Sequence, residues 1–151
     1  MDRYKMEDLK KWKNSTNRKP LIIRGARQVG KTWLMQEFGR KYYEKCAYIN
    51  FDDNTRMNSL FNEDFNIEKI IQGLKIESGV NIEPENTLII LDEIQETPRA
   101  LKALKYFCEN AREYHVVSAG SLLGVAIHEG TSFPVGKVDF MDLMPLSFFE
   151  F

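Results

Sequence analysis

Two glycines, a lysine and a threonine stand at a fixed spacing that is suited to holding a polyphosphate. The stretch consists of Gly25, Ala26, Arg27, Gln28, Val29, Gly30, Lys31 and Thr32, and it fits the pattern G-x-x-x-x-G-K-[ST]. Glycine permits a turn and a close backbone approach that a side chain would block. Backbone N–H groups gathered in such a turn, at the start of a helix, attract an anion. We therefore expect all eight residues to bind the phosphates of a nucleotide.

Lys31 and Thr32 have the two functional groups that this chemistry needs. The lysine would place a positive charge on the β- and γ-phosphates, and the threonine hydroxyl would ligate the Mg²⁺ that neutralises the same oxygens. The alternative is a surface turn with a solvated lysine. The flanking pattern favours the nucleotide site, because an apolar run at 21–24 precedes the loop and a helical stripe at 34–42 follows it.

A second chemical motif follows the apolar run 88–91, which ends in Asp92 and Glu93. Asp92 would hold the magnesium ion opposite Thr32. Glu93 would orient and deprotonate the water that attacks the γ-phosphate, the role of a general base. The alternative is an acidic pair that is merely solvated at the end of a strand. The presence of the first motif favours the catalytic interpretation.

Ser121 is a third candidate, since it follows the predicted strand 115–119. Ligands of parallel α/β sheets bind outside the carboxyl ends of the strands, so this hydroxyl is expected to contact the γ-phosphate or the attacking water. Ser118 is the second choice for this role. Capping of a following helix is the alternative role for Ser121.

These motifs require strands and helices in alternation, and the rest of the chain supplies them. The strands are predicted at 21–24, 47–51, 87–91, 115–119 and 138–140, with helical patterns before the first strand and in each interval up to the fourth. Alternation of this kind predicts an α/β fold with three layers: a central, mostly parallel five-stranded sheet flanked by helices. The boundaries are expected to be a leading amphipathic helix and linker at 1–19, a nucleotide-binding core at 20–144 and the start of a C-terminal helix at 145–151.

Composition indicates one folded domain, because the 151 residues are 43% apolar. No apolar run approaches the roughly 20 residues of a membrane span, and the first residues lack the apolar stretch of a signal peptide. We expect a cytoplasmic protein without a membrane partner. Cys46 and Cys108 lack metal-ligand spacing, and His115 and His128 are not catalytic candidates.

The charge is distributed unevenly along the chain. Residues 1–45 contain 13 Lys and Arg against 5 Asp and Glu, whereas residues 46–151 contain 8 against 17. Part of the positive charge lies outside the phosphate loop, at Lys10, Lys11, Lys13, Arg18 and Lys19. Such a basic helix face could contact nucleic acid, or it could be solvated or docked on the protein's own acidic surface.

With these motifs in hand, the chain resembles the N-terminal ATPase domain of prokaryotic AAA-type ATP-binding proteins that carry a C-terminal domain of unknown function. The resemblance covers most of the chain. Beyond the glycine-rich loop it rests on residues 91–95 (LDEIQ), 119–126 (AGSLLGVA), 132–138 (SFPVGKV) and 145–151 (PLSFFEF).

The resemblance implies an AAA-like P-loop fold, ATP as the nucleotide with Mg²⁺, and Ser121 at the sensor position. It also implies a C-terminal domain as a partner, with a homo-oligomer as a further expectation. Ser147 and Glu150 form the capping box S-x-x-E, which announces a helix. We expect this helix to be truncated here and the fragment alone to be a weak ATPase.

The sequence therefore predicts Mg²⁺-dependent binding and hydrolysis of ATP that drives or gates another domain or partner. The alternative is a nucleotide-gated switch, a binding module with negligible turnover that could be linked to nucleic acid. Glu93 distinguishes the two, because only the hydrolase needs a general base.

Overall fold

A computed structural model of the chain describes residues 3–25, 30–63, 65–120 and 136–143. The helices are α1 (Arg3–Asn14), α2 (Lys31–Tyr42), α3 (Thr55–Glu63), α4 (Ile67–Ser78) and α5 (Pro98–Asn110). The strands are β1 (Leu21–Arg24), β2 (Lys45–Asn50), β3 (Thr87–Asp92), β4 (His115–Gly120) and β5 (Asp139–Asp142). A short 3₁₀ turn, η1 (Ile94–Glu96), follows β3.

The five strands form one sheet in the order β2-β3-β4-β1-β5, and every pairing is parallel. This confirms the predicted three-layer α/β fold with a parallel five-stranded sheet. Some strand boundaries differ from the predicted ones by one or two residues. The strand predicted at 47–51 spans Lys45–Asn50, and the one predicted at 138–140 spans Asp139–Asp142.

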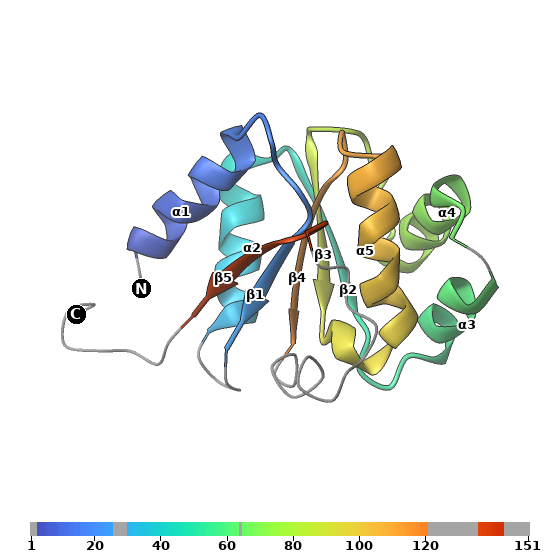
Figure 1. Cartoon of the computed structure of the whole chain (residues 1–151). Helices are drawn as coiled ribbons and strands as arrows, with labels where there is room; N and C mark the ends of the chain where they lie inside the picture. The colour runs from blue at the N-terminus through green and yellow to red at the C-terminus, as the bar shows by residue number, and fades with distance from the viewer. Residues whose placement is uncertain (1–2, 26–29, 64, 121–135, 144–151) are drawn as a thin grey trace.

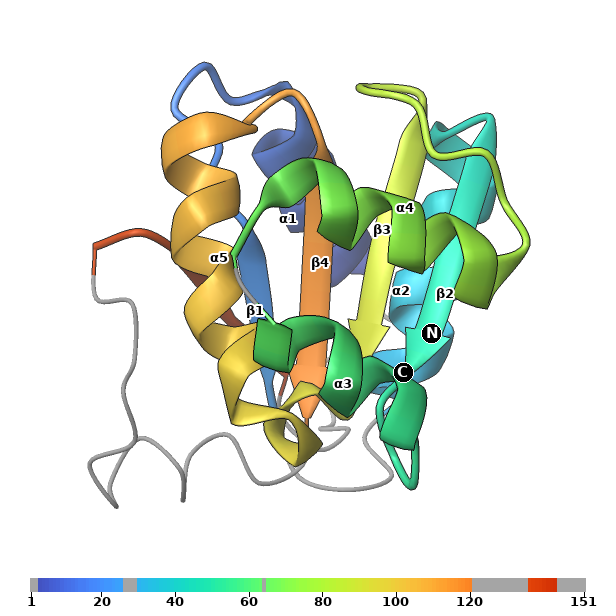
Figure 2. The ribbon, with the colours of Figure 1, turned by 90° about the vertical axis from the view of Figure 1, so that its right-hand side faces the viewer.

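Helices cover both faces of the sheet. α1 and α2 lie on one face, and α3, α4 and α5 lie on the other (Figure 1). Figure 2 looks onto the second face, with α1 and α2 behind the sheet. In both views the strands run downward, so the carboxyl ends of β2, β3 and β4 lie along the lower edge of the sheet.

Alternating side chains of the strands build two hydrophobic clusters, one for each face. In β3, Ile89 and Leu91 pack with α3, α4 and α5, whereas Leu88 and Ile90 pack with α1 and α2. All six residues of β3 are buried. A strand that is covered on both faces needs no polar positions, which explains its continuous apolar run.

The leading helix belongs to the second of these clusters. Leu9 and Trp12 of α1 are buried there beside Phe38 of α2. The indole Nε1 of Trp12 donates to the carbonyl of Lys19 at 2.7 Å, and the backbone N–H of Lys19 donates to Asp139 Oδ2 at 3.1 Å. The segment between α1 and β1 is therefore fastened to the edge strand β5.

Residue type alone predicts two helix boundaries: Gly79 as the end of a helix, and Thr97 before Pro98 as the cap at the start of another. These two predictions have different outcomes. Gly79 ends α4 in the left-handed conformation (φ 72°), as predicted, and its N–H donates to the carbonyl of Lys75. Thr97 precedes Pro98 at the start of α5 but makes no capping hydrogen bond. Its hydroxyl instead donates to Asn58 Oδ1 of α3 at 2.6 Å. The predicted cap is wrong in this respect, because a tertiary partner competes for the hydroxyl.

No helix in the described part of the chain is long and apolar enough to cross a membrane.

Candidate active site

The ends of β1 and β3 bring the two sequence motifs to the same edge of the sheet. β4 lies between these strands, with Gly120 opposite Arg24 of β1 and Ala119 opposite Asp92 of β3. β1 ends at Arg24, directly before Gly25, and its carboxyl end lies on the same side of the sheet as that of β3 (Figure 1). Motifs far apart in the sequence therefore meet across a single intervening strand.

The described part of the glycine-rich loop has the backbone that the motif needs. Gly30 adopts a left-handed conformation (φ 87°, ψ 21°) immediately before α2, where a residue with a side chain would be strained. Lys31 is only 7% exposed, and its Nζ donates to the carbonyl of Gly25 at 2.9 Å. The ammonium group thus lies beside Gly25, the first residue of the glycine-rich motif. Ala26, Arg27, Gln28 and Val29 lie outside the described residues.

Thr32 and Asp92 are in direct contact, and this contact joins the two motifs. The Thr32 hydroxyl donates to Asp92 Oδ2 at 2.6 Å, and the backbone N–H of Glu93 donates to Asp92 Oδ1 at 3.0 Å. Asp92 is only 3% exposed. Hydroxyl and carboxylate oxygens are the ligands that Mg²⁺ prefers, with nucleotide phosphates and water completing its shell. The two residues therefore fit a magnesium–nucleotide complex.

Tyr48 is a contact of Asp92 that the sequence analysis missed. Its hydroxyl donates to Asp92 Oδ2 at 2.6 Å, the same oxygen that Thr32 contacts. Burial and the hydrogen bond to Asp92 both raise the pKa of the Tyr48 phenol, so it stays protonated and can donate. The available signal was a tyrosine two residues before the end of a short strand, which alone does not identify a partner.

Glu93 has an unusual backbone and a fixed side chain. It is a non-glycine residue in the left-handed region (φ 55°, ψ 42°), a conformation that costs on the order of 1 kcal/mol. Gln95 Nε2 donates to Glu93 Oε2 at 2.6 Å. The Oε1 atom of Gln95 is buried without a hydrogen-bond partner in the described part of the chain. In the sequence, Gln95 stands out only as part of the LDEIQ segment at 91–95.

The two serine candidates are not brought to this site together. Ser121 lies outside the described residues. Ser118 is fully buried, and its flanking residues Val117 and Ala119 belong to the cluster on the α1/α2 face. Ser118 therefore points to the opposite face of the sheet from Asp92, and its hydroxyl has no partner among the residues described.

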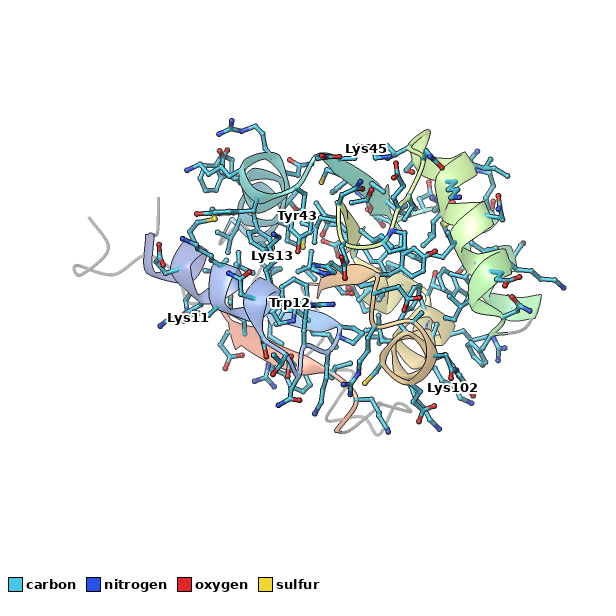
Figure 3. The ribbon with its side chains drawn as sticks, turned by 90° about the horizontal axis from the view of Figure 1, so that it is seen from above. Lys11, Trp12, Lys13, Tyr43, Lys45 and Lys102 are labelled. Carbon is cyan, nitrogen blue, oxygen red and sulfur yellow. The ribbon has the colours of Figure 1, made fainter. Side chains whose placement is uncertain are left out.

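The basic residues near the N-terminus contact the protein itself to a large extent. Arg18 donates to the backbone carbonyls of Lys13 and Arg112, at 3.2 Å and 2.6 Å. The Nζ atoms of Lys10 and Lys13 lie over the rings of Tyr42 and Tyr43. Figure 3 shows Lys13 on the side of α1 that faces Tyr43. These contacts favour intramolecular docking over the nucleic-acid interpretation.

Residues 17–151 match the model of a protein family described as an AAA domain. No curated protein matches the sequence.

Solved structures of similar fold include the Walker-type ATPase paby2304 of Pyrococcus abyssi, with a TM-score of 0.61 and 16% identity over 98% of this chain. The Aeropyrum pernix ORC1 protein in complex with DNA gives 0.54 and 16% over 98%, and the T158V variant of Thermotoga maritima RUVB gives 0.58 and 13% over 96%. The chain spans 54%, 45% and 44% of these three chains, about half of their length.

Proposed function

This chain belongs to the AAA domain family, and from that premise we propose that it binds ATP together with Mg²⁺ and hydrolyses it. The observation that carries the proposal is the 2.6 Å hydrogen bond between Thr32 and Asp92. The Thr32 hydroxyl directly follows the phosphate-binding loop, and the Asp92 carboxylate is buried at the end of β3, two strands away from β1 in the sheet. Such a pair forms the metal-binding half of a P-loop site.

Each residue has a distinct role in this proposal. Lys31 and the N–H groups from Gly25 to Thr32 bind the phosphates, while Thr32 and Asp92 hold the magnesium ion. When bound, the ion neutralises charge on the phosphate oxygens and so favours attack at the γ-phosphate. Glu93 accepts the proton of the attacking water. Ser121 is proposed to sense the γ-phosphate.

Gln95 orients this base, because its Nε2 donates a hydrogen bond to Oε2 of Glu93 at 2.6 Å.

We propose further that hydrolysis drives or gates another domain or partner, because the chain spans about half of the solved structures that it matches. The Aeropyrum pernix protein was solved with DNA, but at 16% identity it is evidence for the fold alone. Since Arg18 and Lys13 contact the chain's own groups, the proposal concerns nucleotide and does not extend to DNA.

Nucleotide titration and steady-state turnover test this function. We expect the protein to bind MgATP and to release phosphate from it, with MgADP and MgGTP titrated alongside to define the preferred nucleotide. Glu93→Gln should bind MgATP with wild-type affinity and lose roughly 10²- to 10⁴-fold in turnover, because the amide cannot accept a proton. Glu96→Gln is the matched control, since Glu96 is an exposed carboxylate of the same turn.

Two results would contradict parts of this proposal. If Glu93→Gln and Glu96→Gln turn over equally fast, Glu93 is not the base. If the wild type binds MgATP and shows no turnover above the Glu93→Gln level, the protein is a nucleotide-gated switch rather than a hydrolase.

A further inference from the structure

Within the described residues, Asp92 accepts hydrogen bonds from three donors, and one of them has no role in the proposed reaction. The Thr32 hydroxyl and the Glu93 N–H belong to the two nucleotide motifs. The Tyr48 hydroxyl comes from β2, the edge strand next to β3, and contacts Oδ2 at 2.6 Å. The two nucleotide motifs do not explain this hydrogen bond from Tyr48 to Asp92.

The pairing of β2 and β3 explains how Tyr48 reaches this position. Asn50 is opposite Asp92, and Tyr48 is opposite Ile90, so Tyr48 and Asp92 are diagonal neighbours. The ring of Tyr48 packs, partly buried, against the cluster on the α1/α2 face, the same face from which α2 presents Thr32. Because the packed ring restricts its own hydroxyl, that hydroxyl is a fixed donor.

We infer that Tyr48 is a positioning residue for the magnesium site, which holds the Asp92 carboxylate in the orientation that receives the ion. The inference rests on the proposed function. Two hydroxyls bind Oδ2 and a backbone N–H binds Oδ1, so rotation of the carboxylate would break all of these hydrogen bonds. Thr32 can keep its hydrogen on Oδ2 while a lone pair of its oxygen faces the ion. Tyr48 is then the side-chain donor, beside the backbone N–H of Glu93, whose hydrogen bond serves only to orient Asp92.

Loss of an orienting partner of a metal ligand typically costs 10- to 100-fold in metal affinity. Tyr48→Phe retains the packed ring and removes only the hydroxyl. We therefore expect the Mg²⁺ concentration for half-maximal effect on nucleotide binding to rise by roughly tenfold in this variant. Affinity for the nucleotide without metal should not change, because Lys31 and the loop are untouched.

Tyr43→Phe is a closely matched control. The Tyr43 hydroxyl also makes a 2.6 Å hydrogen bond, to His115 Nδ1, and its partner is also buried. His115 is the first residue of β4, whereas the candidate site lies at the carboxyl ends of the strands. This substitution removes the same chemical group from an equally short bond and should leave the Mg²⁺ dependence at the wild-type value.

The experiment is a titration of fluorescent N-methylanthraniloyl-ATP, first in EDTA and then at fixed nucleotide with increasing MgCl₂. It is run on the wild type, Tyr48→Phe, Tyr43→Phe and Asp92→Asn, with thermal unfolding of each variant measured in parallel. Tyr48→Met is added as a second variant, because it removes the hydroxyl with a different, adaptable side chain. If Tyr48 had a purely structural role, its variants would lose thermal stability, and their nucleotide affinities in EDTA and in MgCl₂ would change by the same factor.

The expected result is a shift of the Mg²⁺ midpoint in both Tyr48 variants and none in Tyr43→Phe, with equal affinities in EDTA. The inference is overturned if the Tyr48 variants keep the wild-type midpoint while Asp92→Asn loses its Mg²⁺ response. It is also overturned if the EDTA affinity falls as much as the Mg²⁺ affinity. If the wild type itself shows no Mg²⁺-dependent nucleotide binding, the proposed function fails, and the inference fails with it.

Discussion

Asp92 and His115 are buried polar residues on neighbouring strands, and a tyrosine hydroxyl from the α1/α2 side contacts each of them. Tyr48 donates to Asp92, and Tyr43 lies 2.6 Å from His115 Nδ1. Burial, together with the smaller effect of the nearby cations of Arg18 and Lys13, lowers the pKa of His115 to about 4. The ring is therefore neutral at pH 7. The Tyr43 hydroxyl and the neutral ring share this hydrogen bond, with the direction set by the tautomer of His115.

Because His115 is neutral in the folded protein, we expect the free energy of unfolding to fall in acid. The pKa of an unfolded histidine is about 6.5. Between pH 6.5 and pH 4, the unfolded chain therefore binds a proton at His115 that the folded protein does not bind. Stability then decreases as pH falls, by up to about 1.4 kcal/mol per pH unit from this group. We expect His115→Gln to flatten the dependence of the unfolding free energy between pH 6.5 and 5, measured by urea denaturation. Equal slopes in the two proteins would contradict this origin.

Some residues of the site could be predicted from the sequence and others could not. Lys31, Thr32, Asp92 and Glu93 lie in motifs with local spacing, and the structure brings Thr32 and Asp92 into contact. The contacts of Tyr48 and Gln95 depend on strand register and on the left-handed backbone of Glu93. Neither property has a signature within a short stretch of sequence, so these two residues appear only in the folded structure.

At the scale of the elements, α2 lies against the sheet through a glycine. A Cβ atom at Gly39 would lie 2.7 Å from Cys46 Sγ in β2 and 3.3 Å from Leu88 Cδ2 in β3. Glycine therefore lets the helix that carries Lys31 and Thr32 approach the strands that carry Tyr48 and Asp92. The distance between these elements sets the contact between the two motifs.

Gly39→Ala should consequently destabilise the protein, although alanine is favoured over glycine in helices by about 1 kcal/mol. Overpacking of a core costs roughly 1 to 3 kcal/mol, and we expect a net loss of about 1 kcal/mol, measured by urea denaturation. With Cys46→Ala as the background, the closest contact is gone and the same substitution should become neutral or stabilising. The account of this contact is wrong if Gly39→Ala stabilises the protein equally in both backgrounds.

The elements themselves were largely predictable, because their signals are local. The apolar runs at 21–24 and 87–91 and the stripe of α4 identify a strand or a helix without tertiary information. The details that failed depend on contacts between elements. Thr97 bonds to Asn58 of α3 rather than to its own helix, and β5 pairs with β1 through residues that extend beyond the predicted strand.

At the scale of the whole molecule, the strand order has the greatest consequence for function. The sequence predicts parallel strands, but periodicity cannot show that β4 is inserted between β1 and β3. This insertion places one strand between β1, which precedes the glycine-rich loop, and β3, which ends in Asp92. The order depends on how the crossovers pack over the two faces, which is a property of the entire chain.

The central claim is that this edge of the sheet binds MgATP through Lys31. Calorimetric titration of MgATP into the wild type, Lys31→Ala and Lys41→Ala tests it most directly. Lys41 is an exposed lysine at the other end of α2 and serves as the control for loss of a positive charge. The account predicts binding to the wild type and to Lys41→Ala, and at least roughly tenfold weaker binding to Lys31→Ala, because a charge-assisted contact contributes about 1.5 to 3 kcal/mol. Equal affinities for all three proteins would contradict it.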